Sequence, residues 1–292
     1  MAVIEIQAKT MLAHIREPDD LFGLKYNMNL YRGCQHQCIY CDSRSACYEI
    51  ENFNHDVLVK ANALELLEKE LPRKRVKGVV GTGSMNDPYM PLEERYGLTR
   101  GALALIARYG FGVHVLTKSD LVLRDIDLLQ KISRVGAAVG FSISTTDNDL
   151  GKKLEPGAPP PSARFHAMRV LTEQGIRAGA IMMPVLPFLQ DTPENIRAVV
   201  EQTAAHGGRF IVPWFGMSLR DRQREHYYQN LDRLFPGLRQ QYERAFGDRY
   251  GCSARNAKPL ANLFYSLCQQ YGLDTRIPNN TKNQKAEQLS LL

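Results

Sequence analysis

Three of the six cysteines in this 292-residue chain lie within eight residues, at Cys34, Cys38 and Cys41. Thiolates are ligands for soft metals and iron–sulfur clusters. The spacing, three residues and then two, lets one tight loop bring the three side chains to one metal centre. Clusters usually have four cysteine ligands, and no fourth is evident close by. The pattern therefore predicts a centre with one open coordination position, which a catalytic metal needs and a closed structural site lacks.

Tyr40, directly before the last of these cysteines, completes a Cys-x3-Cys-x2-Cys pattern that resembles the motif of the radical S-adenosylmethionine (AdoMet) superfamily. The resemblance implies that the three cysteines hold a [4Fe–4S] cluster. It also implies that AdoMet binds the fourth iron and is cleaved reductively to a 5′-deoxyadenosyl radical. The wider run of residues 31–44 resembles the spore photoproduct lyase-like branch, also called DNA repair photolyases. The alternatives are a zinc knuckle, which usually has two separated ligand pairs, and three buried structural thiols.

The same resemblance implies AdoMet contacts from four separate stretches of the chain. The candidates are Tyr40, Gly81, Thr82, Gly83, Lys118, Ser142 and Ser144. Tyr40 would contact the adenine. The Gly-Thr-Gly stands where the superfamily has a Gly-Gly-Glu type motif, so backbone carbonyls would have to accept the AdoMet ammonium.

Lys118 follows a predicted strand, and an ammonium there would pair with the AdoMet carboxylate. Ser142 and Ser144 alternate with apolar residues, so their hydroxyls share one face of a strand. A plain loop, a surface lysine and hydrogen-bonded barrel serines are the alternatives for these stretches.

The hydrogen donor of spore photoproduct lyases is a cysteine near the end of the second strand. This chain has Ser84 there, and its O–H bond is too strong for efficient hydrogen donation. Asp42 replaces the tyrosine that follows the last cluster cysteine in those enzymes. Cys47 is a second candidate thiol, although free cysteine is more often a small packed residue.

Six apolar stretches are predicted to be strands, and most are followed by a helical pattern. The strands are expected within residues 26–30, 73–81, 111–117, 139–144, 176–186 and 209–214. The helices are expected within residues 57–70, 99–109, 124–134 and 162–174, and another begins at residues 191–194. This order predicts an α/β fold, a partial (β/α)6 TIM-like barrel with a helical C-terminal extension. Such barrels carry their active sites at the carboxyl ends of the strands, where the candidate residues fall.

The predicted domain organisation has four parts. They are an N-terminal lead-in (1–25), the radical AdoMet core (26–215), a helical region (216–278) and a polar tail (279–292). With 44% apolar residues the chain has ample material for a core. No apolar run approaches the roughly 20 residues of a membrane span, and the first residues do not resemble a signal peptide. Free thiols that bind a cluster belong in a reducing compartment, so a cytoplasmic location is expected.

The net charge of +6 and the pI near 9.0 allow a nucleic-acid partner without requiring one. Reductive cleavage also implies a reductant such as flavodoxin or ferredoxin. The last five residues are Gln288, Leu289, Ser290, Leu291 and Leu292. They resemble the Gln-Leu-Ser-Leu-Phe type peptide that docks repair and replication proteins onto the sliding clamp, and an ordinary chain end is the alternative.

Three functional classes follow from these observations. The lyase-like motifs and the basic charge favour a radical enzyme that acts on nucleic acid. The missing donor thiol and the modest charge favour a radical enzyme that modifies a peptide or small molecule. A non-enzymatic metal-binding scaffold is the third class, and it predicts zinc and no AdoMet binding.

Overall fold

The computed structural model describes residues 1–17, 21–50 and 52–277, and within them parallel strands form the main sheet. Each strand pairs with the next strand of this sheet along the chain. They are β3 (Tyr26–Met28), β6 (Val79–Thr82), β7 (Gly112–Thr117), β8 (Ala137–Ser142), β9 (Arg177–Met182) and β10 (Ile211–Pro213). The short β2 (Ala13–His14) adds an antiparallel edge beside β3. β10 and β2 are the two ends of the sheet, so the barrel is open and the predicted partial (β/α)6 fold is confirmed.

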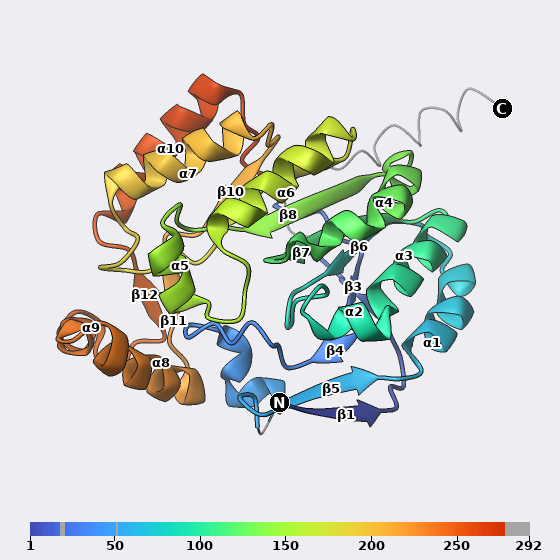
Figure 1. Ribbon diagram of the computed structural model, residues 1–292, viewed down its shortest axis with the longest axis horizontal. Helices are drawn as coiled ribbons and strands as arrows, with labels where there is room; N and C mark the ends of the chain where they lie inside the picture. Colours follow the sequence, from blue (N-terminus) through green and yellow to red (C-terminus); the bar gives the residue numbers. More distant parts are fainter. Residues whose placement is uncertain (18–20, 51, 278–292) are drawn as a thin grey trace.

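Helices lie along the outer side of this sheet, around the strands in Figure 1. They are α1 (Ala63–Glu70), α3 (Leu98–Arg108), α4 (Ile126–Ser133), α6 (Pro161–Glu173) and α7 (Pro193–Ala205). α6 shows why they pack there, because Phe165, Met168 and Leu171 recur at helical spacing and are buried. α7 begins where its sequence predicts. Thr192 Oγ1 accepts a 3.2 Å hydrogen bond from the Asn195 N–H, and Pro193 occupies the first turn.

The prediction of one helix over residues 57–70 is wrong in its first part. Residues Asp56–Lys60 form the strand β5, and only then does α1 begin. Val57 and Val59 are fully buried and alternate with partly exposed neighbours, which is the period of a strand. β5 pairs with β1 (Ala2–Ile6) and β4 (Tyr31–Arg32) in a separate sheet. The N-terminal lead-in therefore contributes strands to both sheets.

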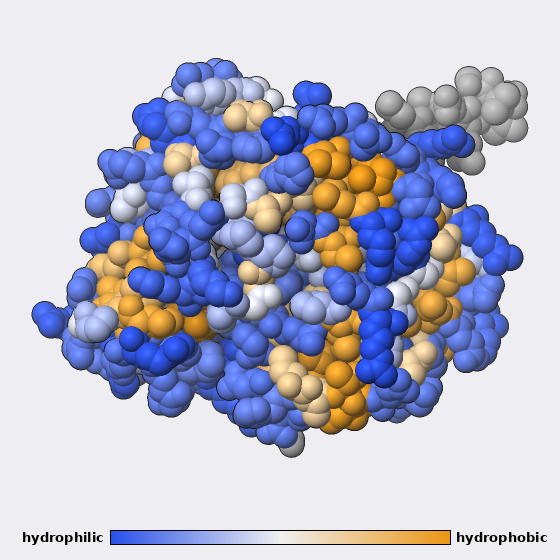
Figure 2. All heavy atoms as spheres, in the orientation of Figure 1, coloured by the Kyte–Doolittle hydropathy of each residue, from blue (hydrophilic) through white to orange (hydrophobic). Residues whose placement is uncertain are grey.

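The C-terminal region is helical, as predicted, but it also contains a small antiparallel sheet. Its helices are α8 (Asp221–Leu234), α9 (Leu238–Phe246) and α10 (Ala257–Tyr271), and its strands are β11 (Gly216–Ser218) and β12 (Gly251–Ser253). α10 packs on α7 and buries Leu260, Phe264 and Leu267. α8 and α9 share an apolar cluster with α5 (Asn148–Leu154) and with Cys38, Ile39 and Tyr40. On the face in Figure 2, hydrophobic side chains of this part show at the left, within a mostly hydrophilic surface.

The remaining elements are short. They are α2 (Leu92–Tyr96) and the 3-10 turns Asp42–Arg44, Ala46–Tyr48, Leu71–Arg73 and Asp120–Asp125. The predicted polar tail, with the clamp-like peptide at residues 288–292, lies outside the described residues. Among the helices that are described, none combines the length and the apolar character of a membrane-spanning segment.

Candidate active site

The cysteine loop, residues 34–41, follows β4 and lies against the carboxyl end of the main sheet. Cys34, Cys38 and Cys41 all line one cavity. Gly83, Lys118 and Ser142, from the ends of β6, β7 and β8, line the same cavity, and so does Tyr40. The structure therefore brings together the three predicted cluster ligands and four of the predicted AdoMet contacts. This is the edge at which barrels of this type hold their active sites.

Gly83 shows why this edge needs a glycine. Its φ is +87°, and a Cβ there would lie 2.2 Å from the Leu116 carbonyl oxygen. The backbone of the Gly-Thr-Gly stretch thus approaches β7 more closely than any other residue type would permit. Gly83 faces the cavity, whereas Gly81 and Thr82 line a neighbouring apolar pocket with His114 and Ile181.

The donor set of the cysteine loop fits an iron–sulfur cluster. Cys34 and Cys38 are buried, and burial raises the pKa of the Cys34 thiol and that of Cys38 to about 12. The guanidinium of Arg44 lies close to the three thiols: burial lowers its pKa, while Cys41, Cys38 and Cys34 act in the opposite direction. Arg44 Nε is buried and, within the described part of the chain, has no hydrogen-bond partner. A buried cation with an unused donor beside three thiols suits an anionic, thiolate-ligated group.

The zinc alternative requires ligands that converge on one ion. Among residues 1–17, 21–50 and 52–277, no group of three or more His, Cys, Asp or Glu side chains is arranged to hold a single metal ion. In a [4Fe–4S] cluster each cysteine binds a different iron, so its sulfur atoms stand farther apart. The described residues thus do not present the converging ligand set that a zinc site needs.

The proline-rich segment after α5 fixes the position of the cysteine loop. Ile39 N–H donates a 2.9 Å hydrogen bond to the Leu154 carbonyl, and Gly157 N–H donates one of 3.0 Å to the His36 carbonyl. A Cβ at Gly157 would lie 2.2 Å from the Gln35 carbonyl oxygen, so this close approach also requires glycine. The sequence presents the segment as a stiff connector, and its contact with the cysteines has no sequence signal.

Asp87 joins the cysteine loop to the ends of two strands, and sequence reasoning missed it. Its carboxylate accepts 2.6 Å hydrogen bonds from Thr117 Oγ1 and from the Lys118 N–H, and it lies 3.1 Å from His36 Nε2. Burial alone would raise the pKa of Asp87, but the His36 charge and these hydrogen bonds hold it at about 2. An ionised carboxylate therefore sets the position of Lys118 and of the cysteine loop together. Its place in the Asn-Asp-Pro turn after β6 is the one hint in the sequence.

A buried ionic group lies next to two of the cavity residues, Tyr40 and Lys118. Glu155 accepts a hydrogen bond from the Tyr40 hydroxyl and lies 2.5 Å from Arg164 Nη2 and 3.8 Å from Lys118 Nζ. Burial would raise the pKa of Glu155, but the charges of Arg164 and Lys118 keep it below its usual value. Arg164 also donates a 2.8 Å hydrogen bond to the Ser142 carbonyl. Two cations share one carboxylate, so this group has an excess positive charge that would suit a carboxylate ligand.

Of the remaining candidates, Ser84 lines this cavity, and Ser144 and Cys47 do not. Ser144 is buried and accepts a 3.0 Å hydrogen bond from Gln190 Nε2, so it serves the barrel and does not line the cavity. Ser84 lines the cavity, with its Oγ 3.0 Å from Asn27 Nδ2. Cys47 is exposed, and its sulfur accepts a 3.0 Å contact from Arg220 Nη1. Cys47 does not line the cavity, so the structure does not bring this thiol to the place where a donor would act.

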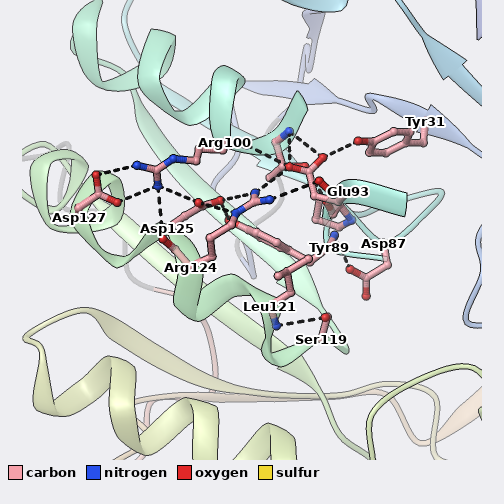
Figure 3. Close-up of polar contacts among 12 residues, drawn as sticks. Tyr31, Asp87, Tyr89, Glu93, Arg100, Ser119, Leu121, Arg124, Asp125 and Asp127 are labelled. Carbon is pink, nitrogen blue, oxygen red and sulfur yellow. Dashed lines mark hydrogen bonds and ion pairs between the residues drawn. The ribbon is translucent and has the colours of Figure 1, made fainter. Parts of the chain in front are cut away.

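A second network of charged side chains centres on the buried carboxylates of Glu93 and Asp125 (Figure 3). The Tyr31 hydroxyl donates to Glu93, which lies 2.7 Å from Arg124 Nη2. Arg124 and Arg100 both pair with Asp125, at 2.8 and 2.9 Å. The side chains of Glu93 and Asp125 are wholly buried, so each charge depends on these partners. Tyr31 lies three residues before Cys34, and the network thereby anchors the entry to the loop.

A partial barrel whose carboxyl edge carries three cysteines in one cavity defines the class of the AdoMet-dependent radical enzymes. Residues 28–203 match the family model of the Radical SAM superfamily. This match spans more than half of the chain. The protein belongs to the Radical SAM superfamily and is a radical SAM enzyme.

The chain is also similar to two uncharacterized proteins and to a solved structure. An uncharacterized protein of Methanocaldococcus jannaschii is 37% identical over 65% of this chain and 70% of its own length. An uncharacterized protein of Mycobacterium tuberculosis is 31% identical over 76% of this chain and 67% of its own. Among solved structures, a spore photoproduct lyase mutant with bound AdoMet and dinucleoside spore photoproduct matches with a TM-score of 0.69. That match covers 93% of this chain and 81% of the other at 14% identity, so it shows a shared fold.

Proposed function

We propose that this radical SAM enzyme acts on nucleic acid, as a relative of the DNA repair photolyases. The observation that carries the proposal is the cavity itself, in which the cysteine loop faces apolar walls from Phe22, Leu116 and Ile181. A spore photoproduct lyase of the same fold has a dinucleoside spore photoproduct bound. The net charge of +6 is a second support, because phosphate backbones bind basic proteins.

The residues present fit the cofactors that the family implies. Cys34, Cys38 and Cys41 would hold a [4Fe–4S] cluster, and Tyr40, Gly83, Lys118 and Ser142 would contact AdoMet. When bound, these cofactors supply a 5′-deoxyadenosyl radical by reductive cleavage of AdoMet, with an electron from a donor such as flavodoxin or ferredoxin. The side chains of the protein would position the cofactors and shield them from water. Lys118 offers its charge to a carboxylate, Asp87 fixes the backbone of Lys118, and the apolar walls keep water away.

A radical enzyme for a peptide or small molecule is the second candidate, and one observation favours it. Apart from the three loop cysteines, no thiol of the described residues lines the cavity, where Ser84 occupies the expected place of a donor. A substrate radical here would have to recover its hydrogen from 5′-deoxyadenosine or from a bound partner. This distinguishes the site from one that repairs spore photoproduct through a protein thiol.

The clamp-like peptide at residues 288–292 lies outside the described residues, and docking to a sliding clamp is part of the proposal only as an expectation from sequence. A cytoplasmic location, where free thiols persist, belongs to the same proposal.

The test is anaerobic reconstitution of the full chain with iron and sulfide, followed by reduction with AdoMet and assay of 5′-deoxyadenosine. Cys38→Ala should lose the cluster absorbance and the product. Cys268→Ala should keep both, because Cys268 is buried on α10 in the main apolar cluster and does not line the cavity. Binding of a single-stranded oligonucleotide should weaken steeply as salt rises. Normal AdoMet cleavage without salt-dependent binding would reject the nucleic-acid substrate and favour the second candidate.

A further inference from the structure

Trp214 is an exposed aromatic residue at the cavity of the cysteine loop. It directly follows β10, the strand that ends the main sheet, and it lines the same cavity as Cys34, Cys38 and Lys118. Its exposed fraction is 46%, which is high for a large aromatic side chain. Figure 1 shows β10 at the margin of the strands, next to the C-terminal elements. Trp214 therefore stands where a bound molecule would enter the open barrel.

The indole ring is not used by the fold. Within the described residues, it has no aromatic partner, no cation over its face and no acceptor for its N–H. The backbone of Trp214, by contrast, is firmly held. Its N–H donates a 3.1 Å hydrogen bond to the Met182 carbonyl, and its carbonyl accepts 3.0 Å hydrogen bonds from Val185 and Gly216. A residue with a fixed backbone and an unpartnered ring can serve as a platform, a flat surface on which a bound molecule stacks.

The surroundings indicate which ligand would use the platform. Phe22, Met85, Met183 and Pro184 line the same cavity and give it apolar faces. A nucleobase, a flat ring with apolar faces and polar edges, matches these walls. Aromatic platforms of this kind bind nucleobases by stacking, and such contacts depend little on the base, because every base has a π face.

We propose that Trp214 stacks against a nucleobase of the substrate and so positions the target nucleotide at the mouth of the cavity. This inference rests on the proposed nucleic-acid substrate and adds the contact by which that substrate is recognised. Trp214 is a positioning residue, because its contact is with a base and not with the reacting atoms.

The test uses two independent signals on the reconstituted full chain at low salt. Anisotropy of a dye-labelled oligothymidylate measures binding, and Trp214 is the only tryptophan in the chain, so its fluorescence reports one position. The expected result is quenching of Trp214 by unlabelled oligothymidylate over the concentration range in which anisotropy rises. Trp214→Ala should weaken binding about tenfold, and Trp214→Phe should weaken it less, because phenylalanine keeps a ring for stacking. Tyr265→Ala should bind normally, because Tyr265 is 52% exposed on α10 and does not line the cavity.

Anisotropy tests the nucleic-acid substrate, and Trp214 quenching tests the stacking contact, so the two parts of the proposal can fail separately. Normal anisotropy with unquenched Trp214 and an unaltered Trp214→Ala variant would overturn the stacking contact and leave the nucleic-acid substrate standing. No anisotropy change would overturn the nucleic-acid substrate, and the base contact with it. Quenching by AdoMet alone that oligothymidylate does not increase would assign the ring to the adenine of the cofactor and overturn the inference. If Trp214→Ala does not fold, the quenching of the wild type and the Trp214→Phe affinity still decide.

Discussion

The side-chain amide of Gln223 donates a 2.8 Å hydrogen bond to the Tyr40 carbonyl oxygen, although the two residues are 183 positions apart in the chain. The same amide donates a 2.8 Å hydrogen bond to the Ser218 carbonyl, and its oxygen accepts one from the Arg220 N–H. Gln223 is 1% exposed. The first turn of α8 therefore holds the cysteine loop directly, and the C-terminal region is part of the active-site structure.

Gln223→Leu should loosen the cysteine loop. The substitution leaves two buried carbonyl oxygens without their donor, which costs about 2 kcal/mol in the free energy of unfolding. Urea unfolding of the metal-free chain measures this loss, and iron content after reconstitution should fall with it. Gln229→Leu, on the exposed face of the same helix, is the matched control and should change neither quantity. Full iron content in Gln223→Leu would show that the loop does not need this contact.

Glu155→Gln should destabilise the cavity wall. The neutral amide leaves the buried Arg164 and the partly exposed Lys118 without their shared carboxylate. Breaking a buried ion pair in this way costs about 3–5 kcal/mol. Thermal or urea unfolding measures the change. Glu173→Gln on α6 is the control, since Glu173 is 65% exposed in its pair with Arg169, and it should have almost no effect. A stability equal to that of the wild type would mean that water compensates the two cations.

A similar loss of stability is expected when the Glu93 carboxylate is neutralised. Glu93→Gln should lower the free energy of unfolding by about 3 kcal/mol, because Arg124 and the Tyr31 hydroxyl lose their charged partner. The neighbouring Glu94→Gln, at an exposed position, should leave stability unchanged. Denaturant unfolding of both variants measures this difference. Equal unfolding midpoints would show that the Glu93 network in Figure 3 does not stabilise the protein.

His226 on α8 should make the free energy of unfolding depend on pH. Burial lowers its pKa to about 4, from 6.5, and the charges of Arg44 and Arg233 act in the same direction. Below about pH 6.5 the unfolded chain takes up a proton at His226 that the folded protein rejects. Stability from this group is thus fully present above pH 6.5 and is lost progressively as the pH falls toward 4.

His226→Gln should remove this contribution. Between about pH 7 and pH 5, the free energy of unfolding of the metal-free variant should fall by roughly 1–2 kcal/mol less than that of the wild type. Urea unfolding at the two pH values gives this difference. His166→Gln, at an exposed position of α6, should keep the pH dependence of the wild type. Parallel pH profiles for wild type and His226→Gln would contradict the assignment.

The strands and the cysteine loop could be predicted from sequence because their signals are local. Cys34, Cys38 and Cys41 stand together, and the buried strands are short apolar runs with turns between them. The strand at Asp56–Lys60 was missed because its leucine and valines merge with the helical pattern that follows. Glu155, Gln223 and Trp214 could not be found, because each acts only through a contact with a residue far away in the sequence. Nothing in the sequence distinguishes them from ordinary residues. They are a glutamate in a proline-rich stretch, a glutamine in a helix and a tryptophan after a strand.

The hydrogen bond from Gln223 to the Tyr40 carbonyl oxygen also bears on the order in which parts of the protein fold. During synthesis the three cysteines leave the ribosome long before the helix that fixes their loop. Until α8 has been made and has packed, the cysteine segment lacks the hydrogen bond from Gln223. The cluster that the family implies would therefore be held in its final position only late in folding, after the C-terminal helices have packed.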